Sequence, residues 1–144
     1  MLDDFLIHVF HKGNTLEAYK VFGAHLETND HKKGVRFTVY APNARSVQVV
    51  GDFNDWDGQN HYMERYTDGG IWTLFIPGVK EFALYKYRIE TQNFATVDRA
   101  DPYAFYSELR PGTASRVYNI ERFRWADKKW LNSRTKNFDK PMNI

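Results

Sequence analysis

Several features that define other protein classes are missing from this chain. Cysteine is absent from its 144 residues, which excludes a disulfide framework and any metal site built on thiolates. The sequence has no apolar run of about 18 residues, the length that suggests a membrane-spanning helix, and no charged-then-apolar leader. We therefore expect a cytoplasmic protein that has no membrane partner.

The motifs of common catalytic, cofactor and metal sites are also missing. There is no G-x-x-x-x-G-K-[ST] or G-x-G-x-x-G phosphate cradle, no G-x-S-x-G nucleophile elbow and no H-E-x-x-H zinc motif. An EF-hand loop that began at Asp52 would have Trp56 and Met63 where calcium needs ligands. Asp52, Asp55 and Asp57 crowd into one turn, unlike the carboxylate pair that glycoside hydrolysis holds across a bond. We predict no catalytic residue, no metal site and no cofactor.

Net charge is small but unevenly distributed along the chain. The chain carries +2 overall, whereas residues 121–144 hold seven basic and three acidic side chains. A basic tail that includes Trp125 and Trp130 is compatible with nucleic-acid binding. The basic residues are mixed with acidic ones and no nucleic-acid motif accompanies them. We therefore predict no nucleic-acid partner and interpret this tail as a linker that packs against another domain.

Turn residues divide the middle of the chain into short segments that alternate or are rich in β-branched and aromatic residues. Such segments, within about 90 residues, are typical of an all-β fold with an antiparallel β-sandwich. The expected strands cover residues 35–40, 46–50, 71–76, 84–91, 94–97 and 116–120.

We also expect a short N-terminal helix over residues 15–22. Asn14 and Glu17 resemble a capping box, Leu16, Tyr19 and Phe22 follow at three-residue spacing, and a glycine comes next. The expected organisation is an N-terminal segment (1–30), the sandwich (31–120) and an extended C-terminal linker (121–144).

The stretch GDFNDWDG, residues 51–58, leaves the second expected strand and is the most informative part of the chain. It places Trp56 among short polar side chains that include Asn54 and Asp57. An indole face covers the apolar side of a pyranose ring, and polar neighbours bond its hydroxyls. This pattern predicts a sugar-binding loop. The alternative is a β-turn whose tryptophan folds back into the core.

A second polar element is the expected strand that begins at Leu84. Alternation places Tyr85, Tyr87 and Ile89 on one face, which we expect to be the core, and Lys86 on the opposite face with Leu84 and Arg88. If Lys86 lies near Trp56, its ammonium is suited to bind ring hydroxyls. The alternative is a solubilising lysine that keeps an edge strand from pairing with another chain.

Several motifs together resemble a known family. The segments are YKVFGAH (19–25), GVRF (34–37) through APNA (41–44), VVGDFNDW (49–56), YKY (85–87), ADPYA (100–104) and RPGTAS (110–115). In this order they are similar to the N-terminal module of bacterial 1,4-α-glucan (glycogen) branching enzymes. That module is an immunoglobulin-like sandwich of carbohydrate-binding module family 48.

The resemblance implies both a parent enzyme and a binding role for this chain. The parent would use a (β/α)₈ barrel of glycoside hydrolase family 13 to cut an α-1,4-glucan and pass the glycosyl unit to a 6-hydroxyl. Neither of its catalytic carboxylates lies here, and we expect the native chain to continue into that barrel, which Trp125 and Trp130 would face. The implied partners are the barrel and α-1,4-glucan, as glycogen or malto-oligosaccharides. Trp56 matches the family's ring-stacking tryptophan, and Lys86 matches its hydroxyl-binding lysine.

One departure from the family pattern weakens the expected affinity. Relatives among the glycogen-binding kinase subunits carry a second stacking tryptophan on the hairpin after the lysine strand, whereas this hairpin reads Thr91-Gln92-Asn93-Phe94. Phe94 is a smaller substitute, and Trp72 is expected in the core. A single platform suggests a dissociation constant of about a millimolar. The predicted glucan-binding residues are Trp56, Lys86, Asn54, Asp57, Asn93 and Phe94.

Two other functions remain open at this point. The module could instead be a structural buttress for the barrel with negligible sugar binding, or a stand-alone glycogen sensor.

Overall fold

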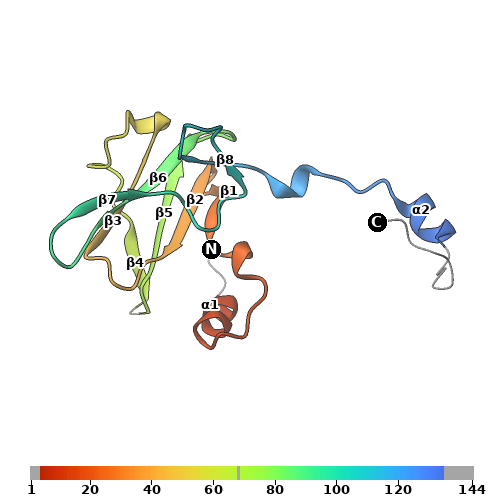
Figure 1. The fold of residues 1–144 in the computed structure, drawn as a ribbon, viewed down its shortest axis with the longest axis horizontal. Helices are drawn as coiled ribbons and strands as arrows, with labels where there is room; N and C mark the ends of the chain where they lie inside the picture. Colours follow the sequence, from red (N-terminus) through yellow and green to blue (C-terminus); the bar gives the residue numbers. More distant parts are fainter. Residues whose placement is uncertain (1–3, 68, 135–144) are drawn as a thin grey trace.

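Two antiparallel sheets packed face to face form the body of the molecule in the computed structural model, which describes residues 4–67 and 69–134 (Figure 1). In the first sheet the strand order is β1 (Gly23–Asn29), β2 (Lys32–Tyr40), β5 (Ile71–Pro77) and β4 (Glu64–Thr67). In the second sheet it is β3 (Ser46–Gly51), β6 (Leu84–Glu90), β9 (Ser115–Arg116) and β8 (Tyr106–Ser107), and β7 (Thr96–Arg99) also pairs with β6. The predicted β-sandwich is confirmed.

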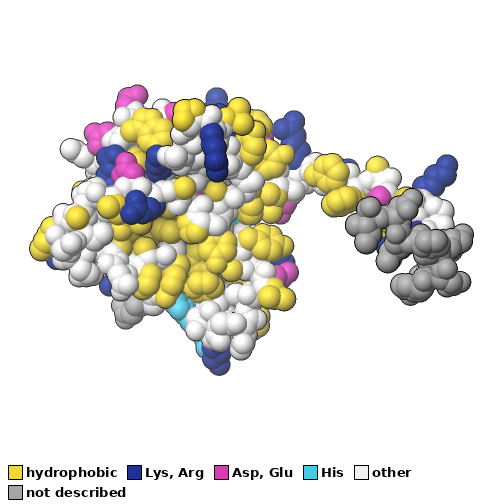
Figure 2. All heavy atoms as spheres, in the orientation of Figure 1, with side chains coloured by type: hydrophobic (Ala, Val, Ile, Leu, Met, Phe, Trp, Pro, Cys, Tyr) yellow, Lys and Arg dark blue, Asp and Glu magenta, His cyan; other side chains and the backbone are white. Residues whose placement is uncertain are grey.

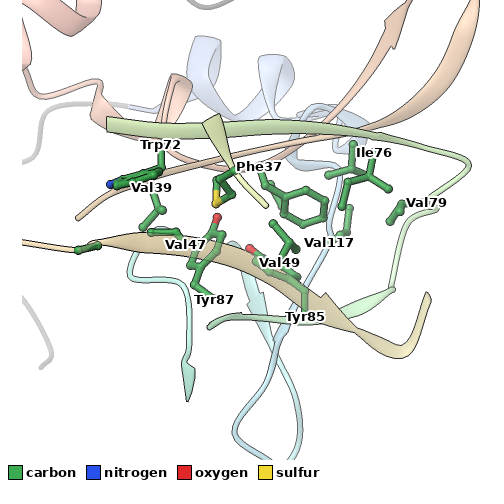
Figure 3. Close-up of a cluster of buried hydrophobic side chains, with 14 residues drawn as sticks. Phe37, Val39, Val47, Val49, Trp72, Ile76, Val79, Tyr85, Tyr87 and Val117 are labelled. Atoms are coloured by element: carbon green, nitrogen blue, oxygen red, sulfur yellow. The ribbon is translucent and has the colours of Figure 1, made fainter. Parts of the chain in front are cut away.

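The core lies between the sheets and comes from the alternation of the central strands (Figure 3). Phe37 and Val39 of β2 face Val49 of β3 and the ring of Tyr87 of β6, and all four side chains are buried. Trp72 is buried beside them, as expected, and its Nε1 donates a hydrogen bond to the Ala41 carbonyl at 3.0 Å.

The predicted division of β6 into two faces is also confirmed. Tyr85 and Tyr87 are buried, whereas Lys86 and Arg88 reach the outer surface of the second sheet. Because successive side chains point to opposite faces of a strand, the buried tyrosines fix which residues face solvent.

The predicted helix over residues 15–22 is wrong. The N-terminal helix is α1 (Asp4–His11), and the expected region contains only the 3₁₀ turn η1 (Ala18–Lys20). Leu16 is 97% exposed, so it does not share a buried stripe with Phe22. Phe22 instead packs in a second cluster with Ile7 of α1 and Ile71 of β5. The three-residue spacing of Leu16, Tyr19 and Phe22 therefore does not reflect a helix, because these side chains do not share one buried face.

Three strands were not expected from the sequence, namely β1, β4 and β8. The residue after the expected helix, Gly23, begins β1, so the boundary expected at residue 31 separates this strand from the sandwich it belongs to. These strands lie at sheet edges, where a polar sequence such as Glu27-Thr28-Asn29 is tolerated. The strand expected at 94–97 begins later, and that expected at 116–120 is reduced to β9, Ser115–Arg116.

The C-terminal segment leaves the sandwich after β9 (Figure 1). It contains the 3₁₀ turn η3 (Ile120–Arg122) and the short helix α2 (Lys128–Ser133). Trp125 and Trp130 are 76% and 62% exposed, and hydrophobic side chains are visible along this segment (Figure 2). Residues 135–144 of the expected linker and 1–3 of the expected N-terminal segment lie outside the described residues.

Among the helices of the described part of the chain, none has the length and apolar character needed to cross a membrane.

Candidate functional site

The loop that carries Trp56 begins where β3 ends and is held by its own side chains. The Gly51 backbone N–H donates to Asn54 Oδ1 at 2.8 Å, and Asn54 Nδ2 donates to the Val49 carbonyl at 3.0 Å. A Cβ at Gly51 would lie 2.2 Å from the Leu84 carbonyl oxygen, so only glycine fits there. Asn54 therefore braces the loop from inside, and its amide is already engaged.

Trp56 lies at the outer surface and not in the core. Its side chain is among the exposed large hydrophobic groups, at 37% exposure. Asp55 and Trp56 have φ values of 53° and 59°, a left-handed conformation that ordinary residues seldom adopt. The Trp56 backbone N–H donates to the Gly51 carbonyl at 2.9 Å and closes the turn. The alternative in which the ring returns to the core is therefore wrong.

Arg88 of β6 connects this loop to the sheet. Its Nη1 donates to the Trp56 carbonyl at 3.2 Å, while Nε and Nη2 bind both carboxylate oxygens of Asp98 at 2.9 and 3.0 Å. These hydrogen bonds lower the pKa of Asp98 and raise the pKa of Arg88. The negative charge of Asp57 also raises the pKa of Arg88. Asp57 is thus close enough to the guanidinium to act on it, and its Oδ1 accepts a bond from the Gln59 backbone.

Lys86 lies on the same outer face. Pairing of Val50 with Lys86 and of Gln48 with Arg88 puts both basic residues beside the strand from which the Trp56 loop emerges. Lys86 Nζ donates to Thr113 Oγ1 at 2.7 Å, its one hydrogen bond among residues 4–67 and 69–134. The remaining donors of an ammonium are then available to a ligand.

Asn93 and Phe94 lie elsewhere on this sheet, at the turn between β6 and β7. The Phe94 ring is exposed and carries the Arg45 guanidinium 3.9 Å from its centroid. Four residues of strand separate Lys86 from the end of β6, a distance of roughly 13 Å. The structure therefore brings Trp56, Asp57 and Lys86 together on one surface but leaves Asn93 and Phe94 at the far end of the hairpin.

Arg88 and Asp98, whose ion pair adjoins the Trp56 carbonyl, were not among the predicted site residues. Alternation along β6 already put Arg88 on the same face as Lys86, so Arg88 could have been predicted from the sequence. Nothing in the sequence singles out Asp98, because its role depends on the register that pairs it with Arg88.

Two carboxylates of the loop, those of Asp52 and Asp57, accept backbone hydrogen bonds. Asp52 Oδ2 accepts a hydrogen bond from the Leu84 backbone at 3.1 Å, which ties the loop to the start of β6. In the described part of the chain, no group of three or more acidic or histidine side chains could hold a metal ion.

A hollow of about 480 Å³ lies away from Trp56, between η1, β1 and residues 118–121. Tyr19, His25, Phe105 and Tyr118 contribute rings to its wall. Neither Trp56 nor Lys86 lines it, whereas residues 118–121, at the start of the C-terminal segment, do.

The family model described as carbohydrate-binding module 48 (isoamylase N-terminal domain) matches residues 21–104. This range covers more than half of the chain and includes both Trp56 and Lys86.

Individual relatives agree with this match. The chain is 50% identical over 127 residues to the 1,4-alpha-glucan branching enzyme GlgB of Bacillus cereus (strain AH820), covering 88% of this chain but only 20% of that protein. The pullulanase from Bacillus acidopullulyticus superposes with a TM-score of 0.56 at 25% identity, over 69% of this chain and 12% of its own. The maltotriose complex of PulA from Klebsiella pneumoniae gives a TM-score of 0.56 at 27% identity, over 73% and 12% respectively.

Proposed function

The chain belongs to carbohydrate-binding module family 48, and on this basis we propose that it is the non-catalytic, N-terminal α-glucan-binding module of a 1,4-α-glucan branching enzyme. In this proposal the outer face of the second sheet tethers glycogen or malto-oligosaccharides beside the catalytic barrel of the same chain. The parent is then a cytoplasmic glycosyltransferase of glycogen biosynthesis that forms α-1,6 branches.

The observation that carries the binding role is the exposed indole of Trp56 on the same face as Lys86. The ring supplies an apolar platform, and the free donors of Lys86 suit the hydroxyls of a bound glucose unit. In this proposal Asp57 accepts hydrogen bonds from sugar hydroxyls, whereas Asn54 acts through the loop conformation that it braces. Asn93 and Phe94 would contact only a longer glucan that extends to the hairpin. The maltotriose complex of the similar PulA supports a glucan as the ligand class.

Trp56→Ala tests this function. The unsubstituted 144-residue chain, called the parent chain from here on, and the variant are titrated with maltoheptaose by isothermal calorimetry and by amide chemical shifts. We expect the parent chain to bind with a dissociation constant of about a millimolar, and the variant to lose roughly fivefold or more because one stacking contact contributes about 1–3 kcal/mol.

Trp125→Ala is the matched control, because that indole is also exposed, at 76%, but lies on the C-terminal segment. Binding that survives Trp56→Ala, or an equal loss in both variants, would contradict the proposed site.

A second candidate function is a structural buttress for the barrel. The specific observation in its favour is the row of exposed aromatic side chains Phe123, Trp125 and Trp130 after the 480 Å³ hollow. Such a surface suits packing against another domain. A parent chain that binds no malto-oligosaccharide in the titration above would favour this role over the tether.

A further inference from the structure

The outer face of the second sheet continues beyond the Trp56 loop as a polar groove. Its volume is about 260 Å³, and it is lined by Ser46, Gln48, Tyr62, Arg88, Glu90 and Thr96. None of these residues except Arg88 contacts the Trp56 loop through a hydrogen bond in the described part of the chain. We refer to these six residues as the outer groove.

Strand register explains why the six side chains meet. Gln48 pairs with Arg88 on one side and with Tyr62 on the other, and the next row pairs Ser46 with Glu90 and Glu90 with Thr96. Residues two apart on a strand share a face, so both rows project outward. Val47 and Val49, the neighbours of Gln48 on β3, are buried in the core and give the groove a packed floor.

Every side chain of the outer groove carries a hydrogen-bonding group, and several are unused. Within residues 4–67 and 69–134, the Gln48 amide and the hydroxyls of Tyr62 and Thr96 make no hydrogen bond. Tyr62 is 53% exposed and adds an aromatic face. Arg88 and Glu90 contribute opposite charges, which suits a neutral ligand. Unused amide and hydroxyl groups beside an exposed ring match a polyhydroxylated ring with one apolar face.

The outer groove is continuous with the site at Trp56. The Arg88 guanidinium both lines the groove and donates to the Trp56 carbonyl at 3.2 Å. The other end of the loop also contacts it, because a Cβ at Gly58 would lie 2.6 Å from Gln48 Oε1. A linear ligand stacked on Trp56 would therefore enter the groove by crossing the loop itself.

We propose that the outer groove is a second subsite for the same α-glucan, in which Tyr62 provides a second ring platform and Gln48 binds sugar hydroxyls. This inference rests on the proposed glucan-binding function and extends it to chain length. A short oligosaccharide occupies Trp56 and Lys86, while a longer one also fills the groove. Tyr62 thus takes the role of the second tryptophan that the 91–94 hairpin lacks, but from the opposite edge of the sheet.

The experiment compares maltotriose with maltoheptaose on the parent chain and on Tyr62→Ala. We expect the parent chain to bind maltoheptaose more tightly than maltotriose. Tyr62→Ala should weaken maltoheptaose binding by about fivefold, the lower range for one stacking contact, and leave maltotriose binding unchanged. Tyr62→Phe should retain most of the length preference because it keeps the ring. Tyr106→Ala, an exposed tyrosine of β8 outside the groove, is the matched control.

Each outcome separates this inference from the proposed function. An equal length preference in the parent chain and Tyr62→Ala overturns the second subsite while leaving Trp56 binding intact. Equal affinity of the parent chain for both sugars overturns it as well. No binding of either sugar overturns the proposed function and the subsite with it. Amide shifts at Gln48 and Thr96 that respond to maltoheptaose but not to maltotriose would support the subsite independently.

Discussion

At the scale of single residues, the carboxyl group of Asp101 is the most constrained polar group in the sandwich. The hydroxyls of Tyr85 and Tyr87 donate to its Oδ2 at 2.7 and 3.0 Å, and the Tyr103 backbone donates to Oδ1 at 2.8 Å. Burial raises the pKa of Asp101, because desolvation of the charged form outweighs the hydrogen bonds that favour it. Burial also raises the pKa of both tyrosines, which therefore keep the protons that they donate.

Asp101→Asn removes this ionisation while it keeps the size of the side chain. Because the folded-state pKa of Asp101 lies above the unfolded-state value, its stabilising contribution is complete below about pH 4 and is lost as the pH rises through the folded-state pKa. We expect the free energy of unfolding of the parent chain, relative to Asp101→Asn, to fall as the pH rises above about 4 in urea titrations.

Asp98→Asn is the control for this pH dependence. Its pKa is lowered by Arg88, so its contribution is present above the ordinary aspartate pKa and disappears only as the pH falls below about 4. The corresponding difference should stay flat over the same range. A flat or rising difference for Asp101→Asn would show that the buried carboxyl is not perturbed as described.

At the scale of elements, the Trp56 loop has a strained backbone that hydrogen bonds from Asn54 and Arg88 hold in place. Its consecutive left-handed residues, Asp55 and Trp56, cost about 1–2 kcal/mol each relative to ordinary backbone. The conformation persists because Asn54 holds the start of the turn and Arg88 holds the Trp56 carbonyl. A loop fixed in this way presents its indole without first being ordered by the ligand, which reduces the entropic cost of binding.

Arg88→Ala tests whether the sheet holds this loop. We expect a lower ¹H–¹⁵N heteronuclear NOE at the Trp56 backbone and indole, together with weaker maltoheptaose binding. The free energy of unfolding should change by less than about 1 kcal/mol, because the pair with Asp98 is partly exposed to solvent. Arg99→Ala, on the neighbouring strand β7, should leave the NOE unchanged. An unaltered NOE in Arg88→Ala would mean that Asn54 suffices to order the loop.

At the scale of the whole molecule, the tryptophans divide according to their environment. Trp72 lies in the core between the sheets, Trp56 lies on the outer face, and Trp125 and Trp130 lie on the C-terminal segment. Within the described part of the chain, the aromatic contacts of the last two are local, such as the edge-on packing of Phe123 and Trp125 with ring centroids 5.0 Å apart. We therefore expect the free energy of unfolding to come from the sandwich, whereas the exposed tryptophans of the C-terminal segment contribute little to it.

Parallel substitutions of tryptophan measure this division. Trp72→Ala should lower the free energy of unfolding by about 3–5 kcal/mol, because it leaves a cavity between the sheets. Trp125→Ala and Trp130→Ala should change it by less than about 0.5 kcal/mol, as expected for exposed positions. Urea denaturation of the three variants provides the measurement. A loss of more than 1 kcal/mol for Trp130→Ala would reveal packing of the segment on the sandwich.

Residue patterns with a period of two predicted the parts of this protein that depend on local alternation. The alternation of β2 and β6 and the outward Lys86 could be read from the chain, because burial of one strand face determines the direction of every neighbouring side chain. The polar loop around Trp56 was likewise recognisable, since its glycines and short polar residues specify a turn in any context.

The remaining features depend on contacts between segments that are distant along the chain. Phe22 matched a helical spacing, but it packs against Ile71 of β5, a residue distant along the chain. The chain at Phe22 leads directly into β1, and the expected helix is absent. The pairing of Arg88 with Asp98 and the approach of Tyr62 to Gln48 follow from strand register. Register is set by the packing of the whole core rather than by neighbouring residues, so the outer groove could be found only once the two sheets were assembled.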